Sequence, residues 1–388
     1  MKILIIIDYF QPIIGYSETF IAKEYIKQWH NVLVLTSDHY YPFPDYENTS
    51  GKMLWSRKQE IWLKIEEWIL TKREKLVFEI FNRAYFKNIN KHIDDFRPDI
   101  VIVNWIASIT VIIVAILKRK FGFKLVSWDS NLMSIINQWI KIKQIFYFIF
   151  RIFFSKFLEK KVDKFVGVQE ETCEIINKFY WIKKELIEFI PLWTDIDKFR
   201  FDEIQRNDIR VKYNIPANAI VLIYTGKLII DKWYDILIKA TSKIIQDFDG
   251  VYVFIIWSWP ENLINEMNEY IKNYKERFVF IDFVKNDELY KYFSASDIWI
   301  WPLQESVSMV EAAACNLPFI ANDKIWTKLR ISNDNALLYK QGDIDDLYEK
   351  IKYLIENKDD MINMWKRWRE LVENKLSWNE IAKEYLIK

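Results

Sequence analysis

The sequence predicts an α/β protein built from two doubly wound domains that face each other across a cleft. Its 388 residues exceed one ordinary core, which favours two domains of roughly 150 to 200 residues each. Both halves alternate short apolar runs with amphipathic stretches, as parallel sheets with crossover helices do. This alternation lapses only near 189–201, "FIPLWTDIDKFRF". We therefore expect a first domain over 1–190 and a second over 191–388, with the final helix crossing back to the first.

In the first half, short apolar runs bounded by polar residues predict buried strands, and longer runs with polar interruptions predict helices. The predicted strands cover residues 2–7, 31–37, 99–104, 124–128 and 164–168. The predicted helices cover residues 18–28 and 76–96.

The second half repeats the scheme. Predicted strands cover residues 219–226, 251–257, 277–283, 297–301 and 318–322, with helices between them. The last helical stretch, from residue 368, is the one that we expect to cross between the domains. Sheets of this kind bind ligands beyond the carboxyl ends of their strands, so the site is sought there.

Composition excludes several classes of function. The 55 Lys and Arg residues nearly cancel the 54 Asp and Glu residues, so nucleic acid is not the expected partner. Two distant cysteines form no disulfide framework and suit a reducing cytosol. Three histidines without ligand-like spacing predict no metal site.

The sequence predicts a cytoplasmic protein, either soluble or at the inner face of the membrane. The initial apolar run, "ILIII", is too short for a signal peptide, and no run reaches the length of a membrane span. Residues 141–164 are basic and aromatic, which is typical of a helix lying on an anionic bilayer. A helix packed into the first domain would carry the same apolar residues.

Tryptophan and glycine occur in abnormal numbers. Tryptophan accounts for 18 residues and glycine for only 7 of 388, or 1.8%, against a usual glycine share of about 7%. The missing glycines and the surplus tryptophans call for one explanation.

Several segments resemble the retaining glycosyltransferases of family 4, which have the GT-B architecture. The matching segments are "MKILIIIDYFQPIIGYSETF", "RPDIVIVN", "IPLWTDIDKFRF", "YTGKLIIDKWYDILIKA", "FIIWSWPE", "ASDIWIWPLQESVSMVEAAACNLPFIAND" and "LSWNEIAKEYL". The resemblance implies a nucleotide-diphosphate-sugar donor on the second domain and a glycan or lipid-linked acceptor on the first. It also implies retention of configuration without a metal or other cofactor, in the synthesis of cell-surface polysaccharide or glycolipid.

The chain repeatedly has tryptophan where this family has glycine. Such positions include Trp29, Trp193, Trp233, Trp257, Trp259 and Trp326. Our hypothesis is that the gene comes from a lineage that reads UGA as glycine, and that the codon is written here as tryptophan. The alternative is a tryptophan-rich protein whose rings fill the core or stack on sugars. The mass of the native protein distinguishes the two.

Two lysines are the predicted catalytic groups. A departing nucleoside diphosphate gains negative charge in the transition state and needs compact positive charge beside it. By resemblance, Lys227 and Lys232 occupy the family's two basic positions, and Gly226 precedes them as a donor-binding residue. The alternative is that both are solvated turn lysines.

Glu311, in "SMVEAAAC", resembles the family residue whose carboxylate accepts both ribose hydroxyls of the donor. The alternative is a first-turn Glu stabilised by the helix dipole. The family's second Glu falls on Leu303, so the nearby Glu305 is a donor-binding candidate in its place. The backbone amides of Val307, Ser308 and Met309 are predicted to receive the β-phosphate at the helix start.

In the first domain, Gly15 lies in the loop that resembles the family's glycine loop, with Ser17 as the predicted helix cap. The alternative is a simple turn glycine. Asp129, in "SWDSNL", is the third catalytic candidate, contacting donor sugar or acceptor. The alternative is that Asp129 holds local backbone.

Two other functions stay open on sequence alone. A nucleotide-sugar epimerase shares this double fold and would act on the donor without an acceptor. A catalytically silent nucleotide-binding protein would bind the donor without turnover.

Overall fold

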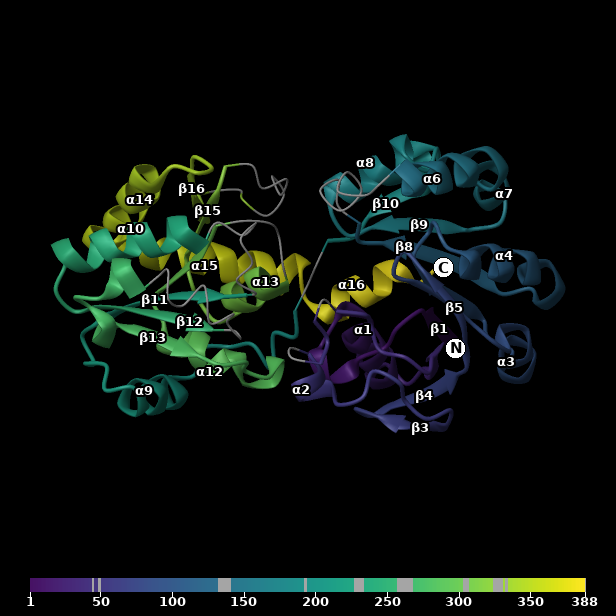
Figure 1. The fold of residues 1–388 in the computed structure, drawn as a ribbon, viewed down its shortest axis with the longest axis horizontal. Helices are drawn as coiled ribbons and strands as arrows, with labels where there is room; N and C mark the ends of the chain where they lie inside the picture. Colours follow the sequence, from purple (N-terminus) through teal and green to yellow (C-terminus); the bar gives the residue numbers. More distant parts are fainter. Residues whose placement is uncertain are drawn as a thin grey trace. The chain divides into compact units, whose positions relative to one another are not determined.

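The computed structural model describes residues 1–43, 45–47, 50–131, 141–191, 194–226, 234–256, 268–302, 307–323, 331 and 334–387. The chain divides into two compact units. Unit 1 comprises Met1–Leu192 and Trp378–Lys388, and unit 2 comprises Trp193–Ser377. The last helical stretch is broken: α15 (Lys358–Lys375) lies in unit 2, whereas α16 (Trp378–Tyr385) packs against α1 in unit 1 (Figure 1).

Unit 1 is built on an eight-stranded sheet in the order β10-β9-β8-β7-β1-β2-β4-β3, in which only the pairing of β3 with β4 is antiparallel. The strands are β1 (Lys2–Ile7), β2 (Asn31–Ser37), β3 (Leu63–Glu66), β4 (Ile69–Glu74), β7 (Ile100–Asn104), β8 (Lys124–Asp129), β9 (Lys164–Gly167) and β10 (Ile187–Phe189). The helices are α1 (Ser17–Lys27), α2 (Gly51–Leu54), α3 (Ile89–Phe96), α4 (Ile109–Phe121), α6 (Lys141–Phe153), α7 (Ser155–Glu159) and α8 (Glu170–Lys178). All five strands predicted for this half are confirmed.

The helix predicted over 76–96 is wrong in its first half. Residues 76–86 form a hairpin of β5 (Leu76–Ile80) and β6 (Arg83–Phe86), and only α3 is helical. The apolar residues Leu76, Phe78 and Ile80 recur with period two, which is the strand period. Phe81 and Asn82 between the strands both have positive φ, 51° and 58°, as a two-residue hairpin turn requires.

Unit 2 is built on a six-stranded parallel sheet in the order β13-β12-β11-β14-β15-β16. The strands are β11 (Ile220–Thr225), β12 (Val251–Ile256), β13 (Phe278–Ile281), β14 (Ile298–Trp301), β15 (Phe319–Asn322) and β16 (Ala336–Tyr339). The helices are α9 (Glu203–Lys212), α10 (Tyr234–Asp247), α12 (Leu289–Ala295), α13 (Val307–Ala314), α14 (Ile344–Glu356) and α15. Helices α10 and α14 pack together on one side of the sheet, with α9 and α12 on the other (Figure 1).

This strand order places a topological switch point between β11 and β14. The five strands predicted for this half are confirmed, and the sequence analysis missed β16. The two doubly wound units confirm the predicted fold class.

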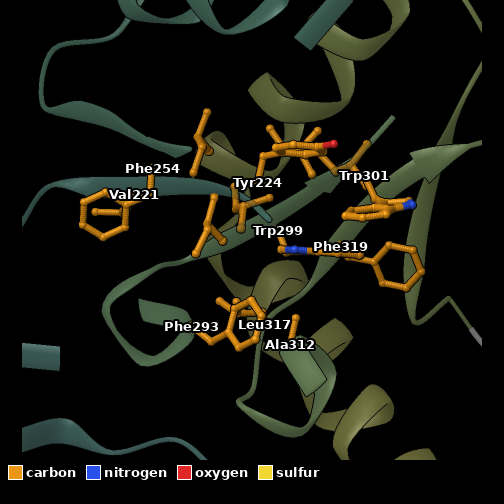
Figure 2. Close-up of a cluster of buried hydrophobic side chains, with 14 of the residues drawn as sticks. Val221, Tyr224, Phe254, Phe293, Trp299, Trp301, Ala312, Leu317 and Phe319 are labelled. Atoms are coloured by element: carbon orange, nitrogen blue, oxygen red, sulfur yellow. The ribbon is translucent and has the colours of Figure 1, made fainter. Parts of the chain in front are cut away.

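A stack of aromatic rings fixes the strand ends at this switch point. Trp299 and Trp301 stack with centroids 4.9 Å apart, and Tyr224 stacks on Trp301 at 5.4 Å. The Trp299 indole N–H donates to Thr225 Oγ1 at 3.4 Å. Figure 2 shows these rings together with Phe319, which meets Trp299 edge-on at 5.8 Å. The ends of β11 and β14 are therefore held by buried contacts.

Tryptophans occupy backbone conformations that favour glycine. Among the described residues, five tryptophans have left-handed φ: Trp29 (63°), Trp55 (56°), Trp68 (70°), Trp105 (71°) and Trp181 (55°). Trp29 follows α1, where the His30 N–H donates to the Tyr25 carbonyl at 2.9 Å, the bond of a helix end that usually carries glycine. Core filling or sugar stacking does not account for this conformation, which supports the glycine hypothesis. The other five tryptophans that the hypothesis names lie outside the described residues.

Replacing Trp68 by glycine is expected to stabilise the protein by about 1 kcal/mol, because a side chain disfavours left-handed backbone. Glu67 and Trp68 form the two-residue turn between β3 and β4, with φ 47° and 70°, and such turns favour glycine. Trp68 is 84% exposed, so few contacts are lost. Urea unfolding measures the change. The matched control, Trp365→Gly within α15, should destabilise; loss of stability in Trp68→Gly would contradict the prediction.

Candidate active site

Gly226 is the predicted donor residue at the β11–β14 switch point, on the carboxyl edge of the sheet of unit 2. Gly226 directly follows β11 with φ 153°, and a Cβ there would lie 3.0 Å from the Trp301 ring. On the neighbouring strand end, the Pro302 carbonyl accepts hydrogen bonds from Asn322 Nδ2 at 2.7 Å and from the Tyr339 hydroxyl at 3.1 Å. Close packing and the positive φ therefore favour glycine at residue 226, and two hydrogen bonds fix the Pro302 carbonyl at the end of β14.

Glu311 lies at one end of a hydrogen-bonded chain of three side chains. Its Oε1 accepts a hydrogen bond from Asn286 Nδ2 at 2.7 Å, and Asn286 Oδ1 accepts one from Lys198 Nζ at 3.1 Å. Glu311 is 1% exposed, and no described residue donates a hydrogen bond to its Oε2. One carboxylate oxygen is therefore held by the protein while the other remains an acceptor.

The position of Glu311 in its helix excludes one alternative. Helix α13 begins at Val307, so Glu311 is its fifth residue and lies in the second turn. The interpretation as a first-turn Glu favoured by the helix dipole is therefore wrong. Val307, Ser308 and Met309 are the first three residues of α13, where backbone amides have no acceptor within the helix.

Lys198 and Asn286 were missed by the sequence analysis. Asp195 Oδ1 accepts hydrogen bonds from the backbone amides of Asp197 and Lys198, both at 3.1 Å, and this turn positions Lys198. Asn286 begins the short 3-10 helix before α12. "TDIDKF" carried part of the family resemblance, but no periodicity or motif in the sequence pairs it with Asn286.

Burial raises the pKa of Glu311 from 4.5 to about 7, against the hydrogen bond from Asn286 and the charge of Lys198, which both lower it. The carboxyl group therefore changes its charge near neutral pH. A buried carboxyl group with a pKa raised in this way is typical of functional residues.

Replacing Glu311 by glutamine is expected to reduce the loss of stability between pH 4.5 and pH 7. The folded-state pKa of Glu311 lies above its ordinary value, so its protonated form contributes stability that is full below pH 4.5 and lost as pH rises through 7. The shift corresponds to about 3 kcal/mol. Urea unfolding at several pH values measures it, and identical pH profiles for both proteins would contradict it.

Three of the predicted donor residues cannot be placed. Lys227, Lys232 and Glu305 lie outside the described residues, so their roles stay predictions. Gly226 follows β11 and α13 follows β14, so Gly226 and the start of α13 both lie at the carboxyl edge of the sheet.

In unit 1, Gly15 occupies a left-handed position with φ 76°, and its N–H donates to the Pro12 carbonyl at 3.2 Å. The left-handed backbone favours glycine there. The prediction that Ser17 caps α1 is wrong: Tyr16 is the cap residue, and it makes no side-chain cap hydrogen bond.

Asp129 is fully buried at the end of β8. Its Oδ1 accepts a hydrogen bond from the Asn131 amide at 2.8 Å, and its Oδ2 accepts one from the Tyr180 hydroxyl at 3.3 Å. Burial raises its pKa, against the charge of Arg83. These contacts favour the alternative that Asp129 holds local backbone.

Asp8 was missed by the sequence analysis and lies at the switch point of unit 1, directly after β1. Its Oδ2 accepts a hydrogen bond from the Ala84 amide at 3.0 Å, while its buried Oδ1 has no partner within the described part of the chain. Asn104 Oδ1, at the end of the neighbouring β7, is also buried without a partner there. Buried polar atoms are usually paired, which makes Asp8 and Asn104 candidates for acceptor contacts.

Unit 2 resembles a known protein family in sequence. Residues 205–374, nearly all of this unit, match the family model of glycosyl transferases group 1. This part of the chain is therefore similar in sequence to the glycosyl transferases group 1 family. The candidate donor site, from Gly226 to Glu311, therefore lies within the part of the chain that matches this family.

Curated relatives match about half of the chain. A GDP-mannose-dependent alpha-(1-6)-phosphatidylinositol monomannoside mannosyltransferase of Mycobacterium tuberculosis is 22% identical over 207 residues, 50% of this chain and 54% of that protein. The capsular polysaccharide biosynthesis glycosyltransferase CapM of Staphylococcus aureus is 25% identical over 200 residues, 49% of this chain and 51% of that protein. The chain thus spans about half the length of the curated relatives that it matches.

Solved structures match the whole chain in fold. HepE of Anabaena in complex with UDP has a TM-score of 0.74 at 15% identity, over 99% of this chain and 98% of that one. Sucrose-phosphate synthase of Thermosynechococcus elongatus has a TM-score of 0.71 at 15% identity, over 99% of this chain and 97% of that one. These structures cover unit 1 as well, which the family model does not match. The whole chain therefore has the GT-B fold.

Proposed function

We propose that this chain is a retaining glycosyltransferase that moves a sugar from a nucleotide-diphosphate-sugar donor to a glycan or lipid-linked acceptor. The observation that carries the proposal is the hydrogen-bonded Glu311–Asn286–Lys198 chain, in a unit that matches the family model of glycosyl transferases group 1. The buried Glu311 carboxylate can accept hydrogen bonds from the two hydroxyls of a ribose, because no described residue donates a hydrogen bond to its Oε2.

The proposed mechanism uses lysine charge and needs no metal. Lys227 and Lys232 stabilise the leaving diphosphate, whose negative charge grows as the glycosidic bond breaks. The leaving phosphate assists attack of the acceptor on the donor's own face, which retains configuration. The first-turn amides of α13, from Val307 to Met309, bind the β-phosphate.

The names of similar proteins support the choice of substrates. The mycobacterial relative depends on GDP-mannose and acts on a phosphatidylinositol mannoside, and CapM acts in capsular polysaccharide biosynthesis. HepE binds UDP. We infer a UDP- or GDP-sugar donor on unit 2, an acceptor on unit 1, and a role in cell-envelope synthesis at the inner face of the membrane, with peripheral contact through 141–164.

A screen of UDP-, GDP- and ADP-sugars for thermal stabilisation tests the proposal. A true donor at a hundred times its Kd should stabilise the folded protein by about 2.7 kcal/mol, and failure of every donor in the panel would contradict it. Incubation with donor alone separates transfer from epimerisation, which alters the donor without an acceptor. Calorimetry that shows donor binding without turnover would favour silent binding.

Metal removal tests the absence of a cofactor. Transfer from the donor identified in the screen is expected to proceed at an unchanged rate in EDTA, because the two lysines supply the charge that a metal would otherwise provide. Loss of transfer in EDTA, restored by added Mg²⁺, would contradict this part of the mechanism.

A further inference from the structure

Helix α6 is apolar on two opposite sides. Tyr147 and Phe150 are buried in the core of unit 1. The outer face carries five large apolar side chains that are between 45% and 68% exposed: Ile145, Phe148, Ile149, Ile152 and Phe153. Four of them follow the i, i+3, i+4, i+7 spacing of one helix face. The core of unit 1 thus uses one face, and the other face presents a continuous apolar stripe.

The β5–β6 hairpin extends this apolar surface. Its side chains Phe78 and Ile80 are half-exposed, and they line a recess whose other wall includes Phe146 and Tyr147 of α6. The rings of Phe81 and Phe146 lie 6.2 Å apart. A soluble protein rarely exposes a contiguous apolar surface of this kind unless it binds something there.

The charge around the stripe identifies the occupant. Residues 141–164 contain seven Lys and Arg residues against two acidic residues, in a chain whose net charge is only +1. Arg151 lies beside Phe148, with its guanidinium 5.8 Å from the ring centroid, and Lys156 and Lys160 are exposed beyond the end of the helix. Apolar side chains bordered by cations match an anionic bilayer surface.

A second copy of this chain fits the surface poorly. A two-fold symmetric dimer would place the same basic segment against itself, and like charges at an interface oppose association. Among the described residues no helix is long and apolar enough to cross a membrane. A stripe on one side of a helix whose opposite side is buried in the core of unit 1 fits a bilayer surface.

We propose that unit 1 docks on anionic membranes through the outer face of α6 together with the β5–β6 hairpin. This inference rests on the proposed function and deepens it. A glycosyltransferase docked on a membrane surface can reach a lipid-linked acceptor there. The apolar stripe enters the headgroup region, and the neighbouring Lys and Arg side chains contact anionic headgroups.

Vesicle flotation of the full chain tests the proposal. The protein is expected to bind vesicles of phosphatidylcholine mixed with phosphatidylglycerol, and to bind phosphatidylcholine alone more weakly. The double variant Phe148→Ser with Ile152→Ser should weaken binding at least about tenfold, since two large apolar side chains leave the bilayer. The matched control is Ile204→Ser with Val211→Ser on α9 of unit 2, where both residues are exposed. It should bind like the wild type.

Three results would overturn the proposal. They are absence of wild-type binding to the anionic vesicles, equal binding by the α6 variant, and a dimer in sedimentation that this variant abolishes. Circular dichroism melting verifies that both variants fold. The donor screen, without vesicles, reports on the proposed function separately: vesicle binding without any donor leaves the docking surface standing, and donor binding without vesicle binding refutes the surface alone.

Discussion

Replacing Lys232 by alanine is expected to lower the turnover number about a hundredfold to a thousandfold, the size of effect seen when one group that stabilises transition-state charge is removed. Lys232 is assigned by family resemblance to the leaving diphosphate, where its ammonium matters most as charge develops. Folding should change little. The measurement is steady-state transfer from the donor identified in the screen, with thermal melting of the same preparation.

The control for this substitution is Lys239→Ala on α10. Lys239 makes an exposed ion pair with Asp235 at 3.4 Å, and such pairs contribute little to stability. The control should transfer sugar at the wild-type rate. If Lys232→Ala does so as well, the lysine is a solvated turn residue and the assignment of the phosphate pair is wrong.

Replacing Glu311 by glutamine is expected to weaken binding of the donor about tenfold to a hundredfold, because a hydrogen bond to a charged acceptor is lost at a buried site. In the wild type, donor affinity should rise as pH increases through about 7, where Glu311 ionises. The variant should lack this rise. Calorimetric titration with the donor at several pH values measures both effects.

A surface carboxylate provides the matched control. Glu356 at the end of α14 is exposed, so Glu356→Gln should bind donor as the wild type does at every pH. Wild-type affinity in Glu311→Gln would show that the carboxylate does not contact the donor. It would leave the hydrogen bond from Asn286 as the only role of Glu311.

Most of the fold could be predicted because parallel strands are buried on both faces. Residues Ile3 to Ile7 are all buried in β1, so the strand reads as an uninterrupted apolar run. The β5–β6 hairpin reads instead as mixed polar and apolar residues, which was mistaken for a helix. The short β16, "ALLY", gives too few residues for any periodicity.

The candidate site could be predicted only where one segment carries it. Gly226 and Glu311 lie in segments with a family pattern, which made them predictable, and their roles in donor binding stay predictions. Asn286 meets Glu311 across 25 residues of sequence, and the Asp8 carboxyl group meets the Ala84 amide across 76. Such pairings arise from tertiary packing, and no local pattern of residue types contains them.

The left-handed backbone at Trp29 has a consequence for producing this protein. If the codon there is UGA, a laboratory host that reads UGA as a stop releases only the 28 residues before it, which include β1 and α1. A synthetic gene for such a host must therefore encode either tryptophan or glycine at each UGA codon. Two recoded genes can be compared, one with tryptophan and one with glycine at the five positions where tryptophan has left-handed φ. The version with the higher soluble yield is the one that we expect the natural host to make.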